Sequence, residues 1–308
     1  MKRRMISVIV LSKNNGDTLD KCLKSIIESD GDKEIIVVDA HSTDNTPQIL
    51  RKYQGKIKVV YDEGKGIGIA RNIGVKHSKG DIICFVDADA FVSKDHFTKI
   101  KKFFDRNPEI GVIHVDHETK PLANLSFAEK MENMLRYSRK IIGLETSSEA
   151  ILASGCFIAF RREVFDDVGG FWEFPPYGAD DNDFSMRALA NGWKIGVVET
   201  DSWHSPRTSF KELFKEMWGW AKGKACWVKK WRNHPLARRM HESQRAFRLL
   251  GRNLLCYTLL AYLSAPLTAI KYLRITKSLS FYLFCILRQY TYLLGFIWGL
   301  ATWARKMS

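Results

Sequence analysis

Paired cysteines are missing from this sequence, and so is an early apolar run of the length found in a signal peptide. Its 308 residues include six cysteines, scattered without the paired spacing of a zinc or redox motif. We therefore expect free thiols in a reducing compartment. The first apolar run, residues 6–11, is too short for the core of a signal peptide. We therefore expect the globular part of the chain in the cytoplasm.

Acidic residues are nearly absent from the last third of the chain. Residues 1–210 carry 30 Lys and Arg against 31 Asp and Glu, whereas residues 211–308 carry 18 against 3. The formal net charge of +14 therefore belongs to the last third. Nucleic-acid-binding surfaces and surfaces that lie on anionic lipid both have this composition.

The apolar stretches near the C-terminus favour lipid over nucleic acid. Residues 210–252 combine aromatic residues with 12 Lys and Arg at helical spacing, which is typical of helices in a lipid headgroup layer. A solvated charged face is the alternative. Residues 253–270 and 279–304 are long apolar stretches, and as helices they would span about 27 Å or more at 1.5 Å per residue. We expect two membrane helices there, or a re-entrant hairpin, and no binding of nucleic acid.

Arg288 lies inside the second apolar stretch. A charged side chain is costly in lipid unless it faces protein, water or a phosphate headgroup. We interpret Arg288 as a candidate contact for the phosphate of a lipid acceptor. The expected domains are a catalytic domain over 1–207, basic amphipathic interface helices over 208–252, and two helices in the cell membrane over 253–308.

Short apolar runs that alternate with helical patterns organise the first 120 residues. Runs at 6–11, 34–39, 57–61 and 82–86 predict buried parallel strands, and so an α/β fold with a mostly parallel, Rossmann-like sheet flanked by helices. Carboxylates follow three of these runs: Asp39, Asp62, and Asp87 with Asp89. Each acid alone could cap a strand end. Three at successive strand ends indicate a ligand site at one edge of the sheet.

The chemistry of these residues favours a phosphorylated ligand. Asp87 and Asp89, one residue apart, suit a divalent cation that already carries phosphate oxygens. Arg71 follows a glycine-rich loop at residues 64–68, near the start of a helix, where phosphate is favoured. The loop does not match the lysine pattern of phosphate-binding loops.

A second group of candidate residues lies between 150 and 205. Gly155 opens an apolar strand at 153–160, where a glycine permits close approach of a sugar. Asp180 and Asp181 begin a helix, where one acid would suffice as a cap. A last strand is predicted over 193–198, and His204 follows it.

Four segments form a series of motifs: SVIV at 7–10 with Asn14 and Asn15, VDAHSTDNT at 38–46, ARNIG at 70–74 and FVDAD at 85–89. In order, spacing and partner residues they resemble the motifs of glycosyltransferase family 2, and the likeness covers roughly residues 5–205. That family has the GT-A nucleotide-sugar fold. One departure is Ala40-His41, where family members often carry a second acid and a glycine.

The resemblance implies a role for each acid. Asp39 would hold the nucleoside, and Asp62 remains a nucleotide-binding candidate from its place at a strand end. Asp87 would hold the ribose or the metal, and Asp89 the divalent ion. The resemblance also makes Asp181 the catalytic base.

Three further residues complete the implied site. Asp180 stands where the family usually has Glu, in the substrate-binding part of the acidic pair. Gly155 would line the sugar pocket, and His204 would be a further metal ligand.

We therefore expect an inverting, hexosyltransferase-like glycosyltransferase that depends on Mg²⁺ or Mn²⁺. It would move a sugar from a UDP- or GDP-sugar to a lipid-linked acceptor, such as a polyprenyl phosphate, or to a polysaccharide at the membrane. The alternatives are a nucleotidyltransferase that forms sugar nucleotides and a non-catalytic, membrane-bound nucleotide-binding protein.

Overall fold

The computed structural model describes residues 5–118, 125–141, 152–153, 155–205, 209–241 and 245–307. The chain divides into two compact units. Unit 1 comprises residues 1–120, 151–176 and 180–205, and unit 2 comprises residues 121–150, 177–179 and 206–308. Unit 2 therefore takes in a segment from the middle of the chain.

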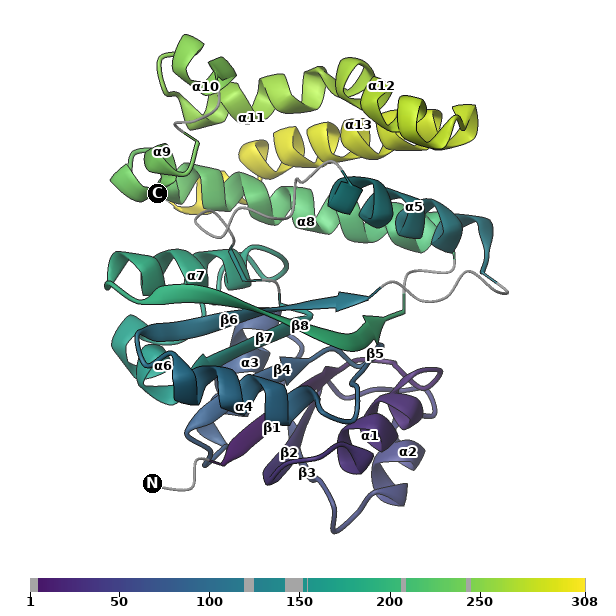
Figure 1. The fold of residues 1–308 in the computed structure, drawn as a ribbon, viewed down its shortest axis with the longest axis vertical. Coiled ribbons are helices and arrows are strands. Elements are labelled where there is room, and N and C mark those ends of the chain that lie inside the picture. The colour runs from purple at the N-terminus through teal and green to yellow at the C-terminus, as the bar shows by residue number, and fades with distance from the viewer. Residues whose placement is uncertain are drawn as a thin grey trace. The chain divides into compact units, whose positions relative to one another are not determined.

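Unit 1 is built on an eight-stranded sheet (Figure 1). Its strand order is β3-β2-β1-β4-β7-β6-β8-β5. The first four strands in this order are parallel, and β7 runs antiparallel to both of its neighbours. The predicted α/β fold with a mostly parallel sheet is thus confirmed. The strands are β1 (Ile6–Ser12), β2 (Lys33–Asp39), β3 (Lys58–Tyr61), β4 (Ile82–Val86), β5 (Ala90–Phe91), β6 (Ile110–Glu118), β7 (Phe157–Arg161) and β8 (Lys194–His204).

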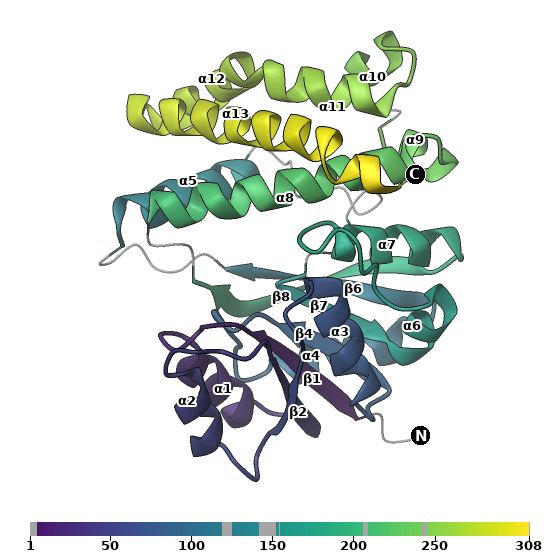
Figure 2. The same cartoon turned by 180° about the vertical axis from the view of Figure 1, so that it is seen from behind.

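Helices cover both faces of this sheet. Alternate residues of β1 point to opposite faces, and these residues are apolar on both, so each face needs a layer of helices. Val8 and Val10 pack in a core with α1, α2 and α4, whereas Ile9 packs in a second core with α3, α6 and α7. Figure 1 shows α4 across one face, and Figure 2 shows α3 across the other. The helices of unit 1 are α1 (Leu19–Glu28), α2 (Thr46–Lys52), α3 (Ile67–Lys76), α4 (His96–Arg106), α6 (Arg162–Val168) and α7 (Asp180–Ala190).

Unit 2 is helical, and its longest helices, α8 and α13, pack against each other. Glycines permit the close approach: a Cβ on Gly299 would lie 2.7 Å from the Lys222 Cα, and one on Gly295 would lie 2.9 Å from the Ala221 Cβ. The described helices are α5 (Phe127–Ile141), α8 (Phe210–Trp231), α9 (Pro235–Arg239), α10 (Arg245–Leu249), α11 (Leu254–Leu263), α12 (Ala265–Thr276), α13 (Leu279–Ala301) and the 3₁₀ turn η1 (Ala304–Met307).

Residues 253–270 do not form the single helix expected from their composition. The structure divides them between α11 and α12, which meet at an angle of 53°. Pro266 lies in the first turn of α12, and proline has no N–H to continue the hydrogen-bond ladder of α11. Among the described helices, α13 is long and apolar enough to cross a membrane, and the bent pair of α11 and α12 would be either one broken span or a re-entrant loop.

The described part of residues 210–252 forms three helices, and it buries some of the aromatic residues that we expected at a lipid surface. Trp227 and Trp231 are buried within the protein, whereas Trp220 is 39% exposed. Two aromatic residues of α8 therefore pack inside unit 2, and the contact of this segment with lipid stays a prediction.

Candidate active site

The acids predicted as a site lie at the carboxyl ends of neighbouring parallel strands. Asp39 ends β2, Asp62 follows β3, and Asp87 follows β4. The backbone N–H of Asp62 donates to the carbonyl of Asp39 at 3.2 Å. These strand ends share one edge of the sheet, which is where open α/β sheets bind ligands.

Asp39 is buried and already has two hydrogen bonds. The backbone N–H of Ser42 donates to Oδ2 at 2.9 Å, and the Ser42 hydroxyl donates to Oδ1 at 2.6 Å. These bonds fix the loop that leaves β2. Since a carboxylate offers about four lone-pair sites, Asp39 keeps capacity for a ligand hydroxyl or N–H.

Asp62 differs from Asp39 because one of its carboxylate oxygens accepts no hydrogen bond from the described residues. The side chain is 4% exposed, and its Oδ1 has no hydrogen-bond partner among the described residues. A buried acceptor without a donor costs about 1–3 kcal/mol. A ligand N–H or O–H that reached this oxygen would remove that cost.

An aromatic pair that the sequence did not reveal lies beside Asp62. The rings of His41 and Tyr61 stack with centroids 5.2 Å apart and planes 12° apart, and Tyr61 is 59% exposed. Their nearness follows from the pairing of β2 with β3, which sets Asp39 opposite Tyr61. His41, at which the sequence departs from the family motif, thus adds a flat aromatic surface next to Asp39 and Asp62, the residues expected to bind the nucleoside.

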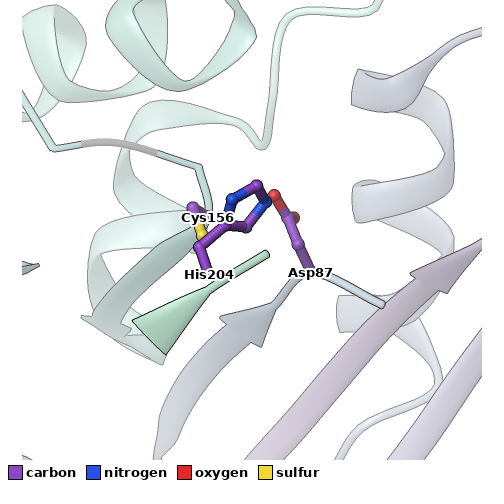
Figure 3. Close-up of side chains that lie close together, drawn as sticks. All are labelled: Asp87, Cys156 and His204. Atoms are coloured by element: carbon purple, nitrogen blue, oxygen red, sulfur yellow. The ribbon is translucent and has the colours of Figure 1, made fainter. Parts of the chain in front are cut away.

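Asp87, Cys156 and His204 turn their side chains toward one another (Figure 3). One possible ligand atom from each lies within 4.8 Å of the others. Asp89 lies next to this group, since its Oδ1 is 3.0 Å from His204 Nε2. The structure thus brings two of the predicted metal ligands, Asp87 and His204, together with a cysteine, and sets the third, Asp89, against His204.

Strand pairing explains how residues so distant in sequence meet. His204 is opposite Ala90 in the pairing of β5 with β8, which sets it beside Asp89. Cys156 directly precedes β7, and its carbonyl accepts the backbone N–H of Asp87 at 3.2 Å. An imidazole nitrogen and a sulfur among carboxylate oxygens favour a transition-metal ion such as Mn²⁺ over Mg²⁺.

Arg71 lies in α3 as predicted, and its partner is Asp180. The two form a buried ion pair, and the guanidinium also lies 5.2 Å from the Phe171 ring centroid. Burial raises the pKa of Asp180 to about 6, while the charge of Arg71 opposes that rise. Gly155 is required here, because a Cβ on it would come within 2.1 Å of Arg71 Nη2.

Asp181, the predicted base, is held differently from Asp180. Its Oδ2 accepts the backbone N–H of Gly155 at 2.8 Å, and its Oδ1 accepts that of Asn182 at 2.7 Å. The residue is half-buried rather than enclosed. Asp181 is therefore positioned by two backbone donors and carries no buried ion pair.

Asp183, the third acid of this helix start, is fully buried and pairs with Arg187 at 2.8 Å. This contact makes Asp183 a structural residue of α7. Arg288 belongs to unit 2, where its Nε lies 3.5 Å from Glu132 Oε1. That contact supplies the protein partner that an arginine in an apolar helix requires.

The fold and the acidic sheet edge define an α/β protein of the GT-A type. The chain matches the family model described as "Glycosyl transferase family 2" over residues 7–169, more than half of its length. It therefore belongs to glycosyl transferase family 2, as its motifs indicated.

Curated relatives include the poly(ribitol-phosphate) beta-N-acetylglucosaminyltransferase TarS of Staphylococcus aureus, 25% identical over 205 residues. That match covers 64% of this chain and 35% of TarS. The glycosyltransferase AglE of Haloferax volcanii is 27% identical over 228 residues, covering 71% of this chain and 72% of AglE. The chain thus spans about a third of TarS and most of AglE.

Solved structures confirm the fold. The mannosyltransferase PcManGT of Pyrobaculum calidifontis, in complex with GDP-Man and Mn²⁺, has a TM-score of 0.68 at 19% identity. That match covers 98% of this chain and 88% of PcManGT. Residues 1–349 of S. aureus TarS in complex with UDP-GlcNAc give a TM-score of 0.53 at 19% identity, covering 98% and 92%. At these identities the likeness shows the fold alone.

Proposed function

We propose that this protein is a metal-dependent, inverting glycosyltransferase that uses a nucleoside diphosphate sugar as donor. The observation that carries the proposal is the cluster of Asp87, Asp89, Cys156 and His204 at the sheet edge of a family 2 chain. A GDP-Man complex with Mn²⁺ in a protein of the same fold supports it. The UDP-GlcNAc complex of TarS leaves both nucleotides as candidates.

The base and ribose of the donor would bind at the ends of β2 and β3. The free Oδ1 of Asp62 suits a ring N–H, and uracil and guanine each present one at the base edge. Tyr61 and His41 offer an aromatic face nearby, and stacking of a base on an aromatic side chain is worth about 1–3 kcal/mol. Asp39 would accept from a hydroxyl or a second N–H.

Asp87, Asp89, His204 and Cys156 would hold the divalent ion. Mn²⁺ fits this set of donors better than Mg²⁺, because the set contains nitrogen and sulfur. When bound, the ion would act as a Lewis acid that neutralises charge on the leaving diphosphate. Holding the ion and the diphosphate is the task of these four side chains.

Asp181 would take the proton of the acceptor hydroxyl as that hydroxyl attacks the anomeric carbon. Two backbone N–H groups hold its carboxylate, and the remaining lone pairs are available to the acceptor. General bases of this kind contribute about 10²–10⁴-fold to a rate. Direct displacement inverts the anomeric configuration.

The acceptor would be lipid-linked or a polysaccharide at the cell membrane, with the catalytic unit on the cytoplasmic side. The apolar α13 supports a membrane location. Arg288 is the proposed contact for an acceptor phosphate, in addition to its ion pair with Glu132.

A thermal-shift screen of UDP-, GDP- and dTDP-sugars with Mn²⁺ tests the donor site. A donor at about 100 times its dissociation constant adds roughly 2.7 kcal/mol to the free energy of unfolding. We expect Asp62→Asn to reduce the shift from the best donor, and Asp166→Asn, an exposed change in α6, to leave it unchanged. No shift with any sugar nucleotide would contradict the proposal. Release of inorganic diphosphate from a nucleoside triphosphate and a sugar phosphate would indicate a nucleotidyltransferase instead.

A further inference from the structure

Unit 2 contains a basic pocket that the proposed glycosyl transfer does not use. The pocket has a volume of about 210 Å³ and lies where the C-terminal ends of α8 and α13 meet the start of α11 and η1. Lys229, Arg232 and Arg305 supply its charge. Leu255 and Leu300 supply apolar wall.

Contacts between α8 and the segment around η1 hold the walls of the pocket in place. Lys229 Nζ donates to the carbonyl of Ala304 at 2.7 Å, which ties η1 to α8. About two helical turns before Lys229 in α8, Lys222 Nζ lies 4.2 Å from the centroid of the Trp303 ring. The glycine-mediated packing of α8 on α13 sets the distance between the two main walls.

Two guanidinium groups face this pocket without a counter-charge. Arg232 and Arg305 are exposed, and their guanidinium groups have no hydrogen bond or ion pair in the part of the chain that the structure describes. The sequence explains this, because residues 217–308 contain one acid, Glu242, against 16 Lys and Arg. Two arginines in one small pocket suit a phosphate group, which guanidinium binds in bidentate geometry.

The surroundings of the pocket are apolar. Ile297 precedes Leu300 by three residues and so lies on the same face of α13. Ile297, Trp298 and Leu294 are each about half exposed. A pocket of this volume is smaller than the roughly 300–1,000 Å³ that enclose a whole drug-sized ligand. It therefore fits the headgroup of an amphiphile whose chains remain outside.

We propose that this pocket binds the phosphate headgroup of an anionic membrane lipid, with the acyl chains along the exposed apolar residues of α13. This is a lipid-binding site of unit 2, independent of the identity of the donor or acceptor. The site would fix where the last third of the chain contacts the bilayer surface.

Calorimetric titration of the full chain in a non-ionic detergent tests the proposal. The probes are dihexanoylphosphatidylglycerol, which is anionic, and dihexanoylphosphatidylcholine, which has no net charge. We expect the anionic lipid to bind about tenfold more tightly or better, and Arg232→Gln with Arg305→Gln to remove this preference. Equal affinity for the two lipids would overturn the proposal.

The matched control is Arg238→Gln with Arg239→Gln, which removes the same charge from exposed positions in α9 outside the pocket. We expect it to change the affinity by less than about twofold, whereas equal losses in both double variants would show general charge attraction and overturn the site. Arg232→Lys with Arg305→Lys, which keeps the charge, should lose less affinity than the Gln pair. Melting curves establish that each variant folds.

A further arm of the experiment identifies the source of the phosphate. Inorganic phosphate at constant ionic strength should compete poorly, because it lacks the apolar contacts with α13. Competition by phosphate at the concentration at which the lipid itself binds would make this a site for free anions and overturn the lipid assignment.

Discussion

Asp180 and Asp181 are adjacent carboxylates with opposite environments. Asp180 is enclosed and tied to Arg71, whereas Asp181 is half-buried and held by backbone N–H groups. Burial with an ion pair makes a residue structural, and partial exposure beside a glycine leaves a carboxylate accessible to substrate. The two positions should therefore respond to substitution in opposite ways.

We predict that Asp181→Asn leaves stability within about 1 kcal/mol, the scale of a helix cap. Donor and metal affinity should also be kept. Sugar transfer should fall by about 10²-fold or more, because an amide cannot accept the proton. Single-turnover transfer and donor calorimetry on the same preparation measure both quantities. Near-normal turnover would move the base to another residue.

We predict that Asp180→Ala destabilises the protein by about 3–5 kcal/mol, because it leaves Arg71 as an unpaired buried charge. The double variant Arg71→Met with Asp180→Leu removes both charges and should recover most of the loss. Thermal unfolding of the single and double variants measures the coupling. If the double variant is no more stable than Asp180→Ala, the ion pair does not explain the cost.

If Cys156 is a metal ligand, its sulfur should affect which metal ions bind. We expect Cys156→Ser to weaken Co²⁺ or Zn²⁺ binding by about 10–100-fold and Mg²⁺ binding much less, because sulfur is a soft ligand. Co²⁺ reports directly, since bound thiolate gives a sulfur-to-cobalt charge-transfer absorption in the near ultraviolet. Cys256→Ser, at an exposed position, is the control. Persistence of that absorption in Cys156→Ser would exclude the cysteine as a ligand.

At the scale of elements, the contact of α4 with β8 predicts a pH dependence. His96 in α4 is fully buried, and its Nδ1 lies 2.7 Å from the hydroxyl of Ser202 in β8. Burial lowers the pKa of His96 from 6.5 to about 3. A proton therefore binds the unfolded chain more readily, so the contribution of neutral His96 is full above pH 6.5 and is lost as the pH falls toward 3.

Lowering the pH from 7 to 5 should thus cost about 2 kcal/mol through this residue. We expect His96→Gln to be less stable at pH 7 yet to lose about 2 kcal/mol less over the same pH interval. Denaturant unfolding of both proteins at the two pH values makes the comparison. Parallel pH profiles would show that His96 is not the titrating group.

Strands and site residues that depend only on the local sequence could be predicted from it. The runs that form β1 to β4 showed up as continuous apolar segments, and the acids at their ends followed directly. β1, β2 and β4 are buried as predicted, whereas β3 lies at the edge of the sheet and is partly exposed. The last strand was predicted over residues 193–198, whereas β8 continues to His204. That continuation depends on pairing with β5 and β6, which no local pattern encodes, and it is what brings His204 to Asp89.

The other unpredicted features also depend on contacts distant in sequence. Cys156 lies close to Asp87 and His204 because β7 pairs antiparallel with β4. The partner of Arg71 lies 109 residues away. Neither relationship leaves a spacing signal, so chemistry could be assigned to the acids but not to the residues that surround them.

At the scale of the whole molecule, the uneven charge follows the two units. Unit 1 holds the acids at the sheet edge, and unit 2 holds most of the excess Lys and Arg and the apolar α13. α5 belongs to unit 2 although it precedes β7 in the chain, because Met131 and Leu135 pack with Leu213 and Phe281. A chain cut after residue 207 would expose this face of α5, and we expect it to aggregate without detergent.

The most direct test of the account is hydrolysis of the donor, in which water takes the sugar and nucleoside diphosphate is released, measured on a panel of UDP- and GDP-sugars with the full chain in detergent. We predict release from at least one donor that requires Mn²⁺, stops on chelation, is abolished by Asp89→Ala, and falls about 10²-fold in Asp181→Asn. Release from no donor, or equal release by folded Asp89→Ala, would contradict a metal-dependent glycosyltransferase.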